Sequence, residues 1–196
     1  MNKNRSHLVI GIFSLLVGSP AVYADHTPSQ ILQAVQSESA PRLDGEVIND
    51  PFWQSVAPGN GFVQTTPEEG EPASQETEIR MVYTADAVYF AFTCYDTKPD
   101  EIIASDARRD ASLDDTDSVV IILDTYLDEQ NGFIFGTNPN GLQYDGQLSK
   151  GGDGGSLVSG SSSGSGGGFN INWDGVWQVK TCLLYTSDAA DDRPRV

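Results

Sequence analysis

The sequence predicts an all-β fold, an antiparallel β-sandwich. Residues 78–84 and 88–95 alternate apolar and polar side chains on either side of a turn at 85–86, as the strands of a hairpin do. Residues 117–126 are rich in β-branched side chains and apolar on both faces, which is typical of a central strand. No stretch carries a long helical period. We therefore expect antiparallel sheets with little helix.

The second half of the chain predicts another hairpin and a last strand. Residues 132–137 and 142–148 flank Asn-Pro-Asn-Gly, a turn-forming sequence. Residues 151–168 are mostly Gly and Ser, which predicts a flexible loop without core-forming content. After this loop, residues 173–181 alternate again, and we expect a strand with Trp177 and Val179 on one face.

The segments before the first hairpin are less regular. Residues 31–35 fit a strand or a single helical turn equally well. Asp50-Pro51-Phe52-Trp53 begins a turn or a short helical stretch, and residues 65–75 read as a polar loop. Trp53 has Phe52 and Val56 nearby, so we expect its large side chain in the core.

The first 24 residues have the three parts of a secretory signal. Lys3 and Arg5 give a positive start, residues 8–17 an apolar run, and Val22-Tyr23-Ala24 a small-residue cleavage pattern. The apolar run is about ten residues long, whereas spanning a bilayer takes about twenty. We expect export with cleavage after Ala24, to the periplasm, outer membrane or cell surface. A retained membrane anchor is the alternative.

The other end of the sequence has a different origin in our interpretation. Residues 182–191 resemble the translation of a sequencing-library adapter, so we expect 182–196 to be an adapter-derived artefact that packs against nothing. The resulting organisation is a signal peptide (1–24), a leader (25–30) and a β-sandwich domain (31–181). We expect this sandwich to be truncated before its last strands, and the natural chain to continue in a C-terminal remainder.

The composition excludes several classes of function. The chain has 28 acidic and 11 basic residues and a net charge of −17, which repels phosphate backbones and argues against nucleic-acid binding. It suits a soluble exported protein or one that binds divalent cations. Only two histidines are present, one of them within the signal, and this argues against catalysis by histidine and against a zinc site with histidine ligands. Before the adapter-like segment Cys94 is the only cysteine, and we expect a buried small hydrophobe.

An ordered set of segments resembles the family 9 carbohydrate-binding module. The segments are 43–45 with Asp50 and Trp53, 77–83 leading to 88–90, 117–124, 135–141 with Asp145, and 173–177. The most similar variant stands at the N-terminus of large exported bacterial envelope proteins that carry a C-terminal barrel-like domain. The resemblance implies a jelly-roll-like sandwich, sugar binding, frequent bound calcium and no catalytic residues.

A cluster of carboxylates precedes the predicted central strand. Calcium takes six to eight oxygen ligands, and Asp110, Asp114, Asp115 and Asp117 are the candidates. The cluster lacks the spacing and glycine of an EF-hand, and a solvated acidic loop is the alternative interpretation.

Sugar binding draws on aromatic rings and polar side chains near loops. A pyranose stacks its C–H face on an aromatic ring, while charged and amide groups bond its hydroxyls. Trp173 lies just past the Gly/Ser loop and is the predicted stacking platform, with Arg109 and Asn138 as polar partners. Trp177 alternates with Val179 and is expected in the core.

Three functions remain open at this point. The leading one is a non-catalytic domain that binds polysaccharide or oligosaccharide for a larger exported protein, in carbohydrate catabolism. The second is a structural periplasmic or surface domain that folds against a membrane-embedded C-terminal remainder of its own chain. The third is an accessory module of a glycoside hydrolase whose catalytic part is missing, which would link the full-length protein to O-glycosyl hydrolase activity. Hydrolysis by this chain needs two carboxylates at a defined separation, and no local pattern picks out a pair among the 28 acids.

Overall fold

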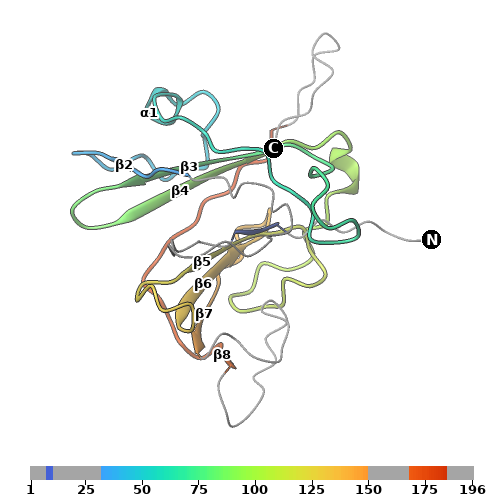
Figure 1. The fold of residues 1–196 in the computed structure, drawn as a ribbon. Helices are drawn as coiled ribbons and strands as arrows, with labels where there is room; N and C mark the ends of the chain where they lie inside the picture. Colours follow the sequence, from blue (N-terminus) through green and yellow to red (C-terminus); the bar gives the residue numbers. More distant parts are fainter. Residues whose placement is uncertain (1–7, 11–31, 150–167, 185–196) are drawn as a thin grey trace, which may run out of the picture. The chain divides into compact units, whose positions relative to one another are not determined.

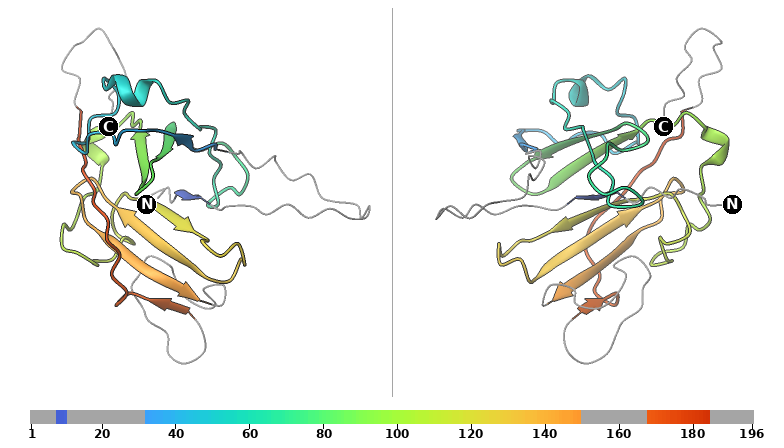
Figure 2. Two further views of the ribbon diagram at one scale, coloured as in Figure 1. Left: turned by 90° about the vertical axis from the view of Figure 1, so that its left-hand side faces the viewer. Right: turned by 45° about the vertical axis from the view of Figure 1, so that its right-hand side comes forward.

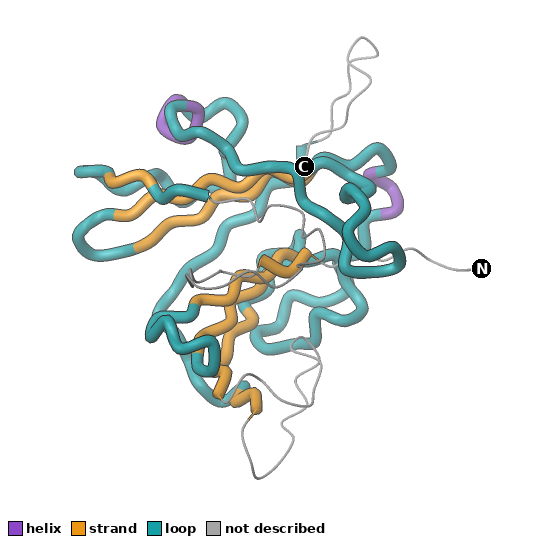
Figure 3. The backbone as a smooth tube through the Cα atoms, viewed as in Figure 1, coloured by secondary structure: helices purple, strands orange, loops and turns teal. Residues whose placement is uncertain are grey.

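The computed structural model describes residues 8–10, 32–149 and 168–184, and these fold into two compact units (Figure 1). In the described part, the first unit contains residues 32–102 and 180–184, and the second contains 8–10, 103–149 and 168–179. Helix is limited, among these residues, to α1 (Pro51–Gln54) and the 3-10 turn η1 (Pro99–Glu101) (Figure 3). None of the described helices has the length and apolar character that crossing a bilayer requires.

The first unit is built on the predicted hairpin. Strands β3 (Thr77–Tyr83) and β4 (Val88–Cys94) pair antiparallel, with Arg80 opposite Ala91, and the short β2 (Val35–Gln36) joins β3 in parallel. Of residues 31–35, for which the sequence allowed a strand or a helical turn, Val35 lies in strand β2, and residues 32–34 form neither a strand nor a helix.

Helix α1 covers one face of this hairpin. The Asp50 carboxylate accepts a hydrogen bond from the Phe52 N–H at 2.8 Å, and a proline occupies the first turn, where its missing N–H costs nothing. The helix places Trp53, which is 4% exposed, in a cluster with Val56, Val82 and Ala91. The prediction that Trp53 belongs to the core is confirmed.

The second unit contains the larger sheet (Figure 2). Its strands are β1 (Leu8–Ile10), β5 (Val119–Leu123), β6 (Gly132–Thr137), β7 (Tyr144–Ser149) and β8 (Gly168–Asn170). They lie in the order β1-β5-β6-β7-β8, with β1 parallel to β5 and all other pairs antiparallel. The predicted central strand and second hairpin are confirmed as β5 and β6–β7.

One face of the larger sheet carries its own core. Alternate residues of the strands bury Val120, Ile134, Tyr144, Leu148 and Phe169, together with Leu113 and Leu142 from the flanking loops. The opposite face bears Phe133 and Phe135, which contact the extended chain that follows β8.

Two glycines make room for bulky side chains in this core. A Cβ on Gly136 would meet a Leu113 methyl at 2.5 Å, and a Cβ on Gly146 would overlap the Phe169 ring. Contacts this short are not tolerated, so a neighbouring group must shift. These positions exclude side chains because their neighbours fill the space.

Replacing Gly146 with alanine is expected to destabilise the second unit by about 1–3 kcal/mol, the usual cost of overpacking. Urea unfolding measures the loss, with Phe169→Leu and the double variant completing a cycle. The double variant should be more stable than the sum of the two single losses predicts, because leucine vacates the space that the new methyl needs. Strictly additive losses would show that the Phe169 ring is not the obstacle.

The predicted all-β class is confirmed, with the two largely antiparallel sheets that a sandwich requires. The predicted strand at 173–181 is wrong: residues 171–183 belong to no ladder, although their exposure alternates. Most of the Gly/Ser segment lies outside the described residues, and its last residue, Gly168, begins β8. Of the segment 182–196, only residues 182–184 are described, and Cys182 is exposed. That 182–196 is an adapter-derived artefact that packs against nothing stays a prediction.

Candidate binding site

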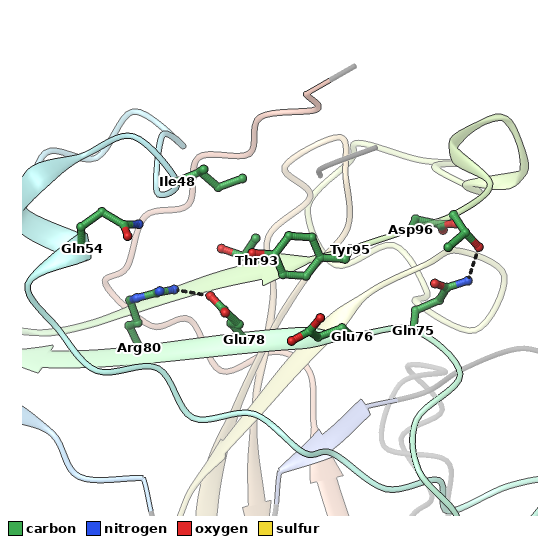
Figure 4. A pocket seen from close by; sticks show the side chains of 10 residues that line it. Ile48, Gln54, Gln75, Glu76, Glu78, Arg80, Thr93, Tyr95 and Asp96 are labelled. Atoms are coloured by element: carbon green, nitrogen blue, oxygen red, sulfur yellow. Dashed lines mark hydrogen bonds and ion pairs between the residues drawn. The ribbon is translucent and has the colours of Figure 1, made fainter. Parts of the chain in front are cut away.

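A pocket of about 470 Å³ opens over β3 and β4 within the first unit (Figure 4). Charged, amide, hydroxyl and aromatic side chains line it, with one aliphatic residue. They are Ile48, Gln54, Gln75, Glu76, Glu78, Arg80, Thr93, Tyr95, Asp96 and Thr97.

The strand period explains how these side chains meet. Glu76, Glu78 and Arg80 are two residues apart, so they follow one another along the same side of β3 (Figure 4). The register places Thr93 opposite Glu78, and Tyr95 follows on the same face. Further along this face the hairpin carries the apolar cluster under α1, and the pocket begins where that cover ends.

Arg80 is the most firmly held group of the pocket. Its side chain is 7% exposed, and its Nη1 lies 2.9 Å from Oε2 of Glu78. Its Nε donates to the Val56 carbonyl at 3.1 Å, which ties the strand to the segment after α1. A buried guanidinium with two fixed acceptors has little rotamer freedom left, so this part of the pocket is organised before any ligand arrives.

The other polar groups are partly engaged with their surroundings. Gln75 Nε2 donates to Thr97 Oγ1 at 2.9 Å, and Gln54 Nε2 donates to the Val47 carbonyl at 3.2 Å. These bonds orient the two amide groups. Thr93 is buried at 2% exposure, whereas Gln54 and Glu76 are exposed at the opening.

Sequence reasoning missed this pocket, because the sequence shows only part of its signal, the polar alternation along one strand. The hairpin prediction used the apolar residues of one face and gave no role to the polar alternation of Glu76, Glu78 and Arg80 on the other. On this face Arg80 and Glu78 form a salt bridge beside Thr93 and Tyr95. A strand that simply faces solvent does not require such an arrangement, so the arrangement indicates a binding surface.

The predicted sugar-site residues Trp173 and Arg109 lie in the second unit. Trp173 is half-buried and stacks on Phe133 with ring centroids 4.5 Å apart. Arg109 Nη2 lies 2.8 Å from Oδ1 of Asp174, the neighbour of Trp173 in the chain. The structure thus brings these two predicted residues into one region, held by packing and ion pairs.

A buried carboxylate anchors this region. Asp145 is fully buried, and its Oδ1 lies 2.6 Å from Nη2 of Arg109. Its Oδ2 accepts the Gly175 N–H at 2.6 Å. The carboxylate therefore fastens the extended segment after β8 to strand β7. Trp177 packs edge-on against Phe135, and its Nε1 is buried without a hydrogen-bond partner among the described residues.

Asn138 organises a loop in this structure. It is 2% exposed, and its Nδ2 donates to the Asp106 carbonyl at 2.7 Å. Its Oδ1 accepts the backbone N–H groups of Asn140 and Leu142. These bonds hold the β6–β7 turn, and they leave Asn138 out of the binding site that we propose below.

The four predicted calcium ligands are not gathered around one point. Asp110 lies 3.6 Å from Arg109, and Asp117 accepts the Ile103 N–H at 2.6 Å. Burial raises the pKa of Asp110, an effect that Arg109 opposes and Asp145 strengthens. In the described ranges no three His, Cys, Asp or Glu side chains are placed to hold a metal ion. Calcium binding through Asp110, Asp114, Asp115 and Asp117 stays a prediction.

Comparisons of this chain with protein-family models, curated proteins and solved structures found no match.

Proposed function

We propose that this chain is a non-catalytic carbohydrate-binding domain whose ligand occupies the β3–β4 pocket. The observation that supports the proposal is the combination, in one pocket, of an aromatic ring with a fixed Arg80–Glu78 pair and two amides. A pyranose offers an apolar C–H face to a ring such as Tyr95 and presents hydroxyls to carboxylate, amide and guanidinium groups. The pocket has a partner for each of these features.

The pocket is suited to holding a ligand more than to transforming one. Oε2 of Glu78 accepts a hydrogen bond from the Arg80 guanidinium at 2.9 Å, so this side chain is already used to hold Arg80 in place. Sugar hydroxyls exchange bonds to water for bonds to protein at a small net gain, so we expect weak binding with the surplus supplied by ring stacking.

Replacing Tyr95 with alanine is expected to weaken binding about tenfold, because an aromatic contact contributes about 1.5 kcal/mol. Affinity electrophoresis through gels containing xylan, hydroxyethyl cellulose or β-glucan measures the effect. Tyr126→Ala is the matched control, since Tyr126 is 69% exposed and lies in the other unit. Melting temperatures of both variants establish that they fold.

The same gels separate the two candidate sites. Loss of retardation in Trp173→Ala, with Tyr95→Ala unchanged, would move the site to the Trp173–Arg109 region. No retardation of the wild type on any polysaccharide would contradict the proposed function.

The burial of the tryptophans favours a second candidate, a structural domain without a sugar site. Trp53 is buried, the indole nitrogen of Trp177 is buried, and one ring face of Trp173 stacks on Phe133 and is therefore not available to a sugar. For either function we propose that the chain is exported, with the signal-like residues 1–24 removed and the domain attached to a larger envelope protein.

A further inference from the structure

The charges of the pocket are unequal. Three carboxylates line it, those of Glu76, Glu78 and Asp96, against the single guanidinium of Arg80. The other lining side chains are uncharged: Ile48, Gln54, Gln75, Thr93, Tyr95 and Thr97. The lining therefore has a formal surplus of two negative charges.

The positive charge of Arg80 is paired with Glu78 and does not balance the other two carboxylates. Arg80 is 2.9 Å from Glu78, and both side chains are shielded from solvent, at 7% and 19% exposure. A close pair in this environment cancels its own field at a distance. An arriving ligand consequently meets the fields of Glu76 and Asp96.

These two carboxylates have no cationic side chain as a partner in the described part of the chain. Glu76 is exposed and forms no side-chain hydrogen bond or ion pair with a described residue. Asp96 accepts the backbone N–H of Lys98 at 2.6 Å. The Lys98 ammonium itself is 3.3 Å from Glu101 and largely exposed, so its charge is directed to another carboxylate.

From this balance we infer that the pocket prefers sugar units that carry a protonated amine over neutral units, and that it rejects uronates. The inference rests on the proposed function and adds the charge class of the ligand. An ammonium gains attraction from Glu76 and Asp96, whereas a uronate carboxylate meets repulsion from both and finds the charge of the pocket's guanidinium already paired with Glu78. Each exposed charge contributes modestly, about a threefold change in affinity.

The test compares three oligosaccharides of equal length under mildly acidic conditions: a glucosamine oligomer, a cello-oligomer and a galacturonate oligomer. Isothermal titration with the whole chain should rank them in this order, the first binding about three- to tenfold more tightly than the second. The preference should shrink strongly at 1 M salt, where the Debye length is about 3 Å.

Two variants assign the preference to the pocket. Glu76→Gln removes one charge and should reduce the ratio of the glucosamine-oligomer affinity to the cello-oligomer affinity about threefold; the ratio is taken within the variant, so a change in hydroxyl bonding common to both oligomers cancels. Glu71→Gln is the control, an exposed carboxylate of the same unit outside the pocket, and should leave the preference intact.

The outcomes separate the inference from the function on which it rests. Equal binding of all three oligomers, or an equal effect of Glu71→Gln and Glu76→Gln, would overturn the charge preference while sugar binding stands. Binding of none of them would overturn the proposed function, and the inference with it.

Discussion

Replacing Trp53 with alanine is expected to destabilise the chain by about 3–5 kcal/mol, a large part of the stability of an ordinary domain. The indole is 4% exposed and packs with Val56, Val82 and Ala91 between α1 and the β3–β4 hairpin. Its removal loses the transfer free energy of the ring and leaves a cavity that a four-residue helix cannot fill. Urea unfolding followed by circular dichroism measures the change.

Trp53→Phe is the companion variant, since it keeps an aromatic ring and should cost less than half as much. The control is Trp173→Ala, because Trp173 is only half-buried and lies in the other unit. An equal loss for Trp53→Ala and Trp173→Ala would contradict the assignment of Trp53 as the principal cover of the hairpin.

Replacing Arg80 with methionine is expected to cost about 3–5 kcal/mol, the usual result of removing one member of a buried ion pair. The variant leaves the Glu78 carboxylate at 19% exposure without its guanidinium, and the Val56 carbonyl without its donor. Most of the loss therefore comes from an uncompensated charge and not from the missing attraction itself.

This explanation predicts a partial rescue. The double variant Arg80→Met, Glu78→Gln should recover stability relative to Arg80→Met, because glutamine places no net charge in the pocket. A surface pair gives the control: Lys98→Met should change stability by less than about 1 kcal/mol, since Lys98 and Glu101 are both exposed. A double variant less stable than Arg80→Met would show that Glu78 stabilises the strand by other means.

The elements that could be predicted from the sequence are those whose signal is local. The hairpin of residues 78–95 follows from a period of two around a short turn, and the structure pairs Ile79 with Phe92 as that period requires. The strand β5 was recognisable because β-branched residues occupy both of its faces. Asp50 before proline likewise marked the start of α1.

The features that the sequence did not predict correctly depend on contacts between residues that are distant in the sequence. Residues 173–181 alternate because the chain lies extended over an aromatic surface, with Trp173 against Phe133, and exposure alternates there without a ladder. The candidate pocket required the register that sets Thr93 beside Glu78, and single-strand patterns do not contain it. The prediction that Asn138 binds sugar rests on its place in a loop, and a buried amide that holds a turn has the same sequence signature.

If the chain is exported and cleaved as we propose, the parallel pairing of β1 with β5 has a consequence for the processed molecule. Residues 8–10 form β1 and lie within the expected signal. Cleavage after residue 24 would therefore remove β1 and leave the backbone N–H and C=O groups on that edge of β5 (Val119–Leu123) unpaired. Apolar edge strands with unpaired backbone groups form hydrogen bonds with strands of other chains and promote aggregation. A processed molecule therefore gains from having that border covered by another segment, and material produced without the first 24 residues would benefit from a lysine or proline placed along β5 to keep it soluble.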